Sequence, residues 1–247
     1  TTNATLMRDD GLMRKLVQKL ACLVVSFDAA TKQTYESIRV GANYDKVISN
    51  IKRFNRFRTE LPAAQRPKLY FSYVLMHSNI GELPEFVRLA HELQADGIGC
   101  AHVVIYDPQI RHESLLFHKE AANRSFIEAS SVASSVGVAL SLPPLYSLGA
   151  QEVSKETTSS GRIECPFLWN RSWIDWNGDV VPCCNGRPGR PYLGNVRQSS
   201  FKEIWNGKVY QAMRKGLATG EPFDFCKHCY IAVKDSCPDD EKAFIAT

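Results

Sequence analysis

The chain has 247 residues, of which 23% are charged, and a formal net charge of +4. Lys and Arg are scattered among Asp and Glu without a basic stripe that carries aromatic residues, so we expect no nucleic-acid partner. No apolar run approaches the roughly twenty residues needed to cross a bilayer, and the first residues lack a signal-peptide pattern, so we expect no membrane partner and a cytoplasmic protein.

Residues 1–150 alternate between strand-like and helix-like patterns, which is typical of β–α–β units and an α/β fold with a parallel sheet. An opening helix has Leu12, Leu16 and Leu20 on one face. About four or five strands are too few for a closed eight-stranded barrel but enough for part of one. Predicted strands lie at 22–27, 69–76, 99–105 and 138–142, and predicted helices at 44–54, 83–93 (ending at Gly97) and 119–136.

The segment 151–161 is polar and rich in Ser and Thr, without periodicity. We interpret it as a linker between a first domain at 1–150 and a second at 162–247.

The second domain begins with a hairpin pattern. Trp173–Trp176 and Asp179–Cys183 are strand-like and flank Asn177-Gly178, the preferred two-residue hairpin turn. The hairpin is expected to bring Cys183 back toward Cys165. A helix is predicted at 200–217, with a buried stripe of Phe201, Ile204, Trp205, Val209 and Met213.

Eight cysteines in a chain without a signal peptide favour metal ligation over disulfides. Four of them form the pattern C-x12-G-x4-C followed by C-x-x-C: Cys165, Cys183, Cys226 and Cys229. Four thiolates that arrive in two pairs suit a tetrahedral zinc ion or an iron–sulfur cluster. The spacing alone leaves both metals open.

The other cysteines are assigned weaker roles. Cys184 is adjacent to Cys183, so on a strand the two point to opposite faces, and either could be the ligand. Cys237 is expected to be a free thiol. Cys22 and Cys100 lie in apolar strands and are expected to be small core residues.

The cysteine pattern is accompanied by Leu193-Gly194-Asn195-Val196 and by Phe201-Lys-Glu-Ile-Trp205. Together these motifs resemble a SPASM domain, the auxiliary-cluster module at the C-terminus of many radical S-adenosylmethionine (AdoMet) enzymes. The first half agrees, because four of its segments resemble successive elements of a radical AdoMet barrel: Thr2–Leu6, Val25–Ala29, Tyr35–Arg39 and Asn79-Ile80. The resemblance implies a partial (β/α) barrel, later strands only, followed by a small α+β cysteine-rich iron–sulfur domain.

The chain departs from that family in two motifs. It contains neither the C-x3-C-x2-C motif that binds the catalytic cluster nor the Gly-Gly-Glu type of strand end. The resemblance therefore implies an N-terminally truncated fragment that begins near the third barrel strand. On its own, the fragment is expected not to cleave AdoMet.

For the full-length parent the resemblance implies a radical AdoMet oxidoreductase or maturase. A reduced 4Fe–4S cluster would pass an electron to AdoMet, and the resulting 5′-deoxyadenosyl radical would abstract hydrogen from a peptide or small-molecule substrate. The implied partners include an electron donor such as flavodoxin or ferredoxin. The auxiliary 4Fe–4S cluster would lie on Cys165, Cys183, Cys226 and Cys229.

The resemblance also places cofactor-binding residues in the first half. Ser26 and Arg39 match positions that contact the methionine and ribose parts of AdoMet. The chemistry fits, because a hydroxyl can donate a hydrogen bond to the carboxylate of the methionine part and a guanidinium can pair with it. Asp28 and Asn79 are further candidates. The alternatives are a cap or turn at Ser26 and Asp28 and a surface ion pair at Arg39. His102 could face a substrate or serve as a structural residue.

A different class of function stays open. The same cysteines could hold a cluster or zinc in a non-catalytic module that docks a peptide or protein partner.

Overall fold

The computed structural model describes residues 1–7, 9–105, 108–148, 165–183 and 189–227. The chain divides into two compact units, residues 1–104 with 112–148 and residues 105–111 with 149–247. The predicted linker at 151–161 lies outside the described residues. Within the described ranges, none of the helices combines the length and apolar character that a bilayer-spanning segment needs.

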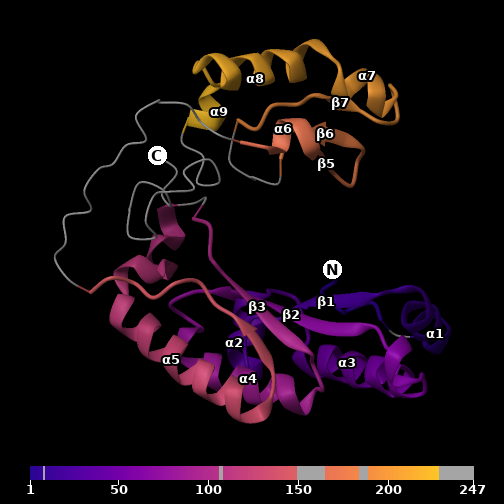
Figure 1. Cartoon of the computed structure of the whole chain (residues 1–247), viewed down its shortest axis with the longest axis vertical. Helices are drawn as coiled ribbons and strands as arrows, with labels where there is room; N and C mark the ends of the chain where they lie inside the picture. Colours follow the sequence, from indigo (N-terminus) through magenta and orange to yellow (C-terminus); the bar gives the residue numbers. More distant parts are fainter. Residues whose placement is uncertain (8, 106–107, 149–164, 184–188, 228–247) are drawn as a thin grey trace. The chain divides into compact units, whose positions relative to one another are not determined.

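A four-stranded parallel sheet forms the centre of the first unit (Figure 1). Its strands lie side by side in chain order: β1 (Cys22–Ser26), β2 (Lys68–Leu75), β3 (Gly97–His102) and β4 (Ala139–Ser141). In addition, Thr2 forms an isolated parallel β-bridge with Val25 of β1. The Thr2 N–H donates to Val24 O, and the Ser26 N–H donates to Thr2 O, both at 2.9 Å. The α/β class with parallel strands is confirmed.

Helices cover one face of this sheet (Figure 1). They are α2 (Lys32–Ile38), α3 (Tyr44–Thr59), α4 (Leu83–Glu92) and α5 (Lys119–Val136), while α1 (Asp10–Lys19) packs on α3. The 3₁₀ turns of this unit are η1 (Ala63–Gln65), η2 (Ile80–Glu82) and η4 (Leu115–Phe117), and η3 (Pro108–Glu113) begins in the second unit. Along β2, Phe71 and Tyr73 are buried, whereas Tyr70 is 36% exposed and Ser72 is half-buried. Side chains alternate along a strand, so one face packs on helices and the other stays open. The first strand, β1, shows the same alternation.

Two expectations for this unit are corrected. In α1, which packs on α3, the buried residues are Met13 and Val17 rather than the Leu stripe, and Leu12 is 36% exposed. The buried stripe has the predicted four-residue spacing but starts one residue later. The helix α4 ends well before Gly97, because Gln94 adopts φ +52° and turns the chain, and Gly97 begins β3.

The second unit contains a three-stranded antiparallel sheet of β5 (Trp173–Ile174), β6 (Asp179–Val181) and β7 (Gly194–Asn195). The predicted hairpin is confirmed as the β5–β6 pair. Its reversal is longer than two residues: the Gly178 N–H donates to Asp175 O at 2.9 Å, and the Asp175 N–H donates to Asp179 O at 2.8 Å. Gly178 adopts φ +91°, a left-handed conformation that glycine allows without strain.

Helices complete this unit: α6 (Phe167–Asn170), α7 (Phe201–Trp205), α8 (Lys208–Thr219) and α9 (Asp224–Lys227). The single helix predicted at 200–217 is wrong, since the chain breaks between α7 and α8 at Asn206 and Gly207. The break changes the phase of the buried stripe. Val209 is 39% exposed, while Tyr210 and Leu217 are buried with Ile204 and Met213.

Candidate functional site

Asp28 joins the carboxyl ends of β1 and β2. Its side chain is 4% exposed, and its Oδ2 pairs with Arg39 Nη2 at 2.5 Å. Its Oδ1 accepts a hydrogen bond from the Val74 N–H at 2.8 Å. An ion pair at Arg39 is therefore present, but with a buried carboxylate rather than on the open surface. A buried carboxylate is costly unless it is paired and hydrogen-bonded, and both conditions are met here.

Asn79 completes this junction. It is fully buried. Its Nδ2 donates to Asp28 O at 2.9 Å and to Val74 O at 2.8 Å, and its Oδ1 accepts from the Met76 N–H at 2.9 Å. Both nitrogen donors and the oxygen of the amide are therefore used within the protein. Asp28 and Asn79 together hold the two strand ends in place.

Ser26 is the last residue of β1, directly before this junction. It is half-buried and pairs in register with Ser72 of β2, on the face opposite the helices. Ser26 does not cap a helix, because Thr31 is the N-cap of α2. The structure thus brings both Arg39 and Asn79 into contact with Asp28, and Ser26 ends β1 two residues before Asp28.

Glu82 is a part of this site that sequence spacing did not indicate. Its carboxylate accepts hydrogen bonds from the backbone N–H groups of Ala30 and Thr31 at 2.9 and 3.0 Å and from the hydroxyl groups of Thr31 and Thr34. Burial is the largest single influence on its pKa and acts to raise it. The hydrogen bonds from Thr34, Thr31 and Ala30 outweigh burial and hold the pKa below its usual value. Glu82 therefore fastens the loop that follows Asp28.

Replacing Glu82 by Gln is expected to make the protein less stable at neutral pH and to remove part of its acid sensitivity. A carboxylate whose pKa is lowered by folding stabilises the fold above its unfolded pKa and loses that contribution as the pH falls through the folded-state pKa. Urea unfolding of Glu82→Gln and wild type should show a stability difference that shrinks between about pH 7 and about pH 3. A difference that stays constant with pH would contradict this role.

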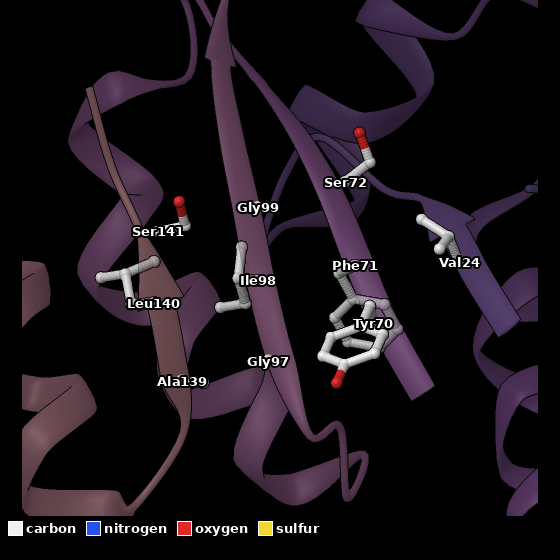
Figure 2. A pocket seen from close by; sticks show the side chains of 10 residues that line it. All are labelled: Val24, Tyr70, Phe71, Ser72, Gly97, Ile98, Gly99, Ala139, Leu140 and Ser141. Carbon is white, nitrogen blue, oxygen red and sulfur yellow. The ribbon is translucent and has the colours of Figure 1, made fainter. Parts of the chain in front are cut away.

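The open face of the sheet carries a cavity of about 480 Å³ (Figure 2). Tyr70 and Ser72 of β2 line it, together with Gly99 of β3 and Ser141 of β4. Its lining contains no charged side chain among the described residues.

His102 does not line this cavity. Its ring lies 5.4 Å from that of Tyr146 and 6.5 Å from that of Phe126 in α5, measured between centroids. Burial lowers the pKa of His102 to about 4, so the ring is neutral at physiological pH. These ring contacts and the burial of His102 agree with the structural role considered for it. The core role expected for Cys22 is wrong, since this residue is exposed, whereas burial raises the pKa of the Cys100 thiol to about 12.

In the second unit, two predicted metal ligands pack against one apolar cluster. Cys165 and Cys226 are half-buried against it. Cys183 is half-buried after β6, close enough to affect Tyr210. Burial chiefly raises the pKa of Tyr210, the Ser172 hydrogen bond and Arg214 oppose it, and Cys183 adds to it. The cluster consists of Leu168, Val180, Ile204, Tyr210, Met213 and Leu217.

The cysteine set is only partly within the described residues. Cys229, Cys184 and Cys237 lie outside them. Among the residues that are described, no three His, Cys, Asp or Glu side chains converge to form a metal-binding group. The chemistry of the donors nevertheless fits an iron–sulfur cluster or zinc, because Cys165, Cys183 and Cys226 are half-buried thiols and two of them, Cys165 and Cys226, pack against one apolar core.

Comparison with known protein families supports the SPASM prediction for this part of the chain. Residues 165–230 match the SPASM family model, an iron–sulfur cluster-binding domain. No curated protein matches the chain significantly. The predicted SPASM domain is confirmed by the family match.

Solved structures share the fold of the chain. SuiB from Streptococcus suis has a TM-score of 0.61 at 13% identity, with 99% of this chain and 60% of that chain covered. The structure of anSMEcpe with bound AdoMet has a TM-score of 0.59 at 14% identity, covering 98% and 65%. SuiB bound to the precursor peptide SuiA has a TM-score of 0.55 at 16% identity, covering 99% and 58%. The chain spans 58–65% of the length of these structures. The resemblance to radical AdoMet enzymes with a SPASM domain is thereby confirmed at the level of the fold and of the SPASM domain.

Proposed function

We propose that this chain is the later part of a radical AdoMet oxidoreductase or maturase with an auxiliary 4Fe–4S cluster on Cys165, Cys183, Cys226 and Cys229. The observation that carries the proposal is the match of residues 165–230 to an iron–sulfur cluster-binding domain, in a chain whose fold over 98% of its length is that of a protein solved with AdoMet. In the full-length parent, AdoMet and a second 4Fe–4S cluster would supply the radical chemistry that removes hydrogen from a substrate.

The residues of this chain would bind and orient AdoMet. We assign cofactor contacts to Ser26, on the open face, and to Arg39, whose guanidinium is partly exposed beside Asp28. Asp28 and Asn79 contribute by positioning, since their hydrogen bonds hold Arg39 and the ends of β1 and β2. A guanidinium that is already oriented loses less conformational entropy when it binds an anionic group.

The proposed substrate is a peptide. SuiB has been solved with its precursor peptide, and this chain shares its fold. An electron donor such as flavodoxin or ferredoxin would reduce the clusters. A cytoplasmic location without membrane partners stays a prediction from the sequence.

The test is the metal and sulfide content of the chain after anaerobic purification and reconstitution, with electron paramagnetic resonance on the reduced sample. We expect about four irons and four sulfides per chain from the auxiliary cluster. One tightly bound zinc ion without sulfide would overturn the cluster and favour a structural metal in a non-catalytic docking module.

A further inference from the structure

Four residues on the open face of the sheet lie in one row. Ser26 pairs with Ser72, Ser72 with Gly99, and Gly99 with Ser141, so the row crosses all four strands at one level. Figure 2 shows the side chains of Ser72 and Ser141 on either side of Gly99. The row therefore carries hydroxyl groups on β1, β2 and β4, and it has no side chain on β3, where Gly99 lies.

Gly99 leaves a gap in the row. A Cβ atom built there would meet no atom within 4 Å. Gly97, two residues earlier, differs: a Cβ there would lie 2.9 Å from Ala139 O and 3.3 Å from Cδ1 of Tyr70. Gly97 is thus needed for packing within the sheet, whereas the space above Gly99 belongs to the cavity.

The chemistry of Ser72 and Ser141, the two serines of the row that line the cavity, suits a neutral group that both donates and accepts hydrogen bonds. A serine hydroxyl can do either, whereas a carboxylate or phosphate would lie against a lining without any cation in the described residues. Ser72 and Ser141 stand two strand spacings apart, or about 9.6 Å between backbones. One amide group with a hydrogen bond of about 2.9 Å on each side spans about 8 Å, which is comparable with this backbone separation.

We propose that Ser72, Gly99 and Ser141 form a subsite for an amide group of a peptide substrate, with Gly99 providing the room for it. The subsite rests on the proposed function, since it specifies which part of a peptide the cavity accepts. Gly99 determines the size of that group, and the two serines select an uncharged amide over a carboxylate.

The test uses nuclear magnetic resonance on the ¹⁵N-labelled chain, titrated with N-acetylglycine N-methylamide as a minimal peptide and with acetate as a charged probe. The minimal peptide should shift the backbone signals of Ser72, Gly99 and Ser141, and acetate should not. Gly99→Val should weaken binding by about ten-fold or more. Ser72→Ala, which removes one hydrogen bond, should weaken binding by about three-fold to ten-fold.

Gly81→Val is the matched control. A Cβ atom at Gly81 also meets nothing within 4 Å, neither glycine has a positive φ, and Gly81 lies outside the cavity lining. Valine suits a strand, so Gly99→Val should keep the unfolding temperature of wild type. Equal binding of acetate, no binding of the minimal peptide to wild type, or unchanged binding to Gly99→Val would each overturn the subsite. The binding experiment requires neither AdoMet nor a metal. The iron and sulfide content of the same samples tests the proposed function separately.

Discussion

Replacing Cys165 or Cys226 by Ala is expected to remove most of the iron and sulfide that the reconstituted chain binds. A 4Fe–4S cluster is held by four ligands, so a missing thiolate leaves one iron exposed and the cluster labile. Cys165 and Cys226 pack against the same apolar cluster although 61 positions separate their numbers in the chain. Iron, sulfide and the electron paramagnetic resonance signal, measured per chain, should fall together in both variants.

Cys22→Ala is the control for these two variants. Cys22 is a free, exposed thiol at the start of β1, far in the chain from the SPASM match at 165–230. Its replacement should leave the iron and sulfide content unchanged. An equal loss of iron in Cys22→Ala would show that the metal is bound unspecifically by accessible thiols.

Asn79→Ala is expected to destabilise the first unit by about 3–5 kcal/mol. The change leaves the Met76 N–H and the carbonyl groups of Asp28 and Val74 without the amide partner that they have in the buried junction. Each buried polar group without a partner costs about 1–3 kcal/mol. Urea unfolding followed by circular dichroism measures the loss as a lower midpoint with an unchanged slope.

Asn3→Ala provides the same substitution at an exposed position of the same unit. The Asn3 side chain accepts hydrogen bonds only from Thr5 among the described partners, and water can replace it. Its effect should stay within about 0.5 kcal/mol. Similar losses in the two variants would mean that the buried junction contributes nothing beyond a surface amide.

The sequence predicted the first half of the fold well where one element carries its own signal. The helix at 119–136 has the observed bounds, and the strands after Ala21 and Pro67 start within one residue of the prediction. Errors occurred where a neighbouring element decides the outcome. The buried stripe of α1, for example, depends on its packing on α3. The break between α7 and α8 is a local feature at Gly207, where a Cβ would lie 3.0 Å from Ile204 O.

The candidate site residues also fall into two groups: those that local sequence signals identify, and those whose roles only the structure shows. The four cysteines were recognised because ligand spacing and the neighbouring motifs are local properties of a chain. The resemblance named four cofactor-binding candidates: Ser26, Asp28, Arg39 and Asn79. It did not show which of them contacts a ligand and which holds the strand ends. Only the structure distinguishes Ser26, on the open face, from Asn79, whose side-chain amide is used within the protein.

The sequence by itself determined the alternation of strands and helices, the α/β class and the cysteine pattern, because hydrophobic periodicity and motif spacing act over a few residues. Tertiary structure decided which sheet face stays open, how Asn79 reaches Asp28 and where Glu82 holds the loop after β1. These contacts join residues about fifty positions apart. The row from Ser26 to Ser141 depends on the register of four strands, which places single residues side by side.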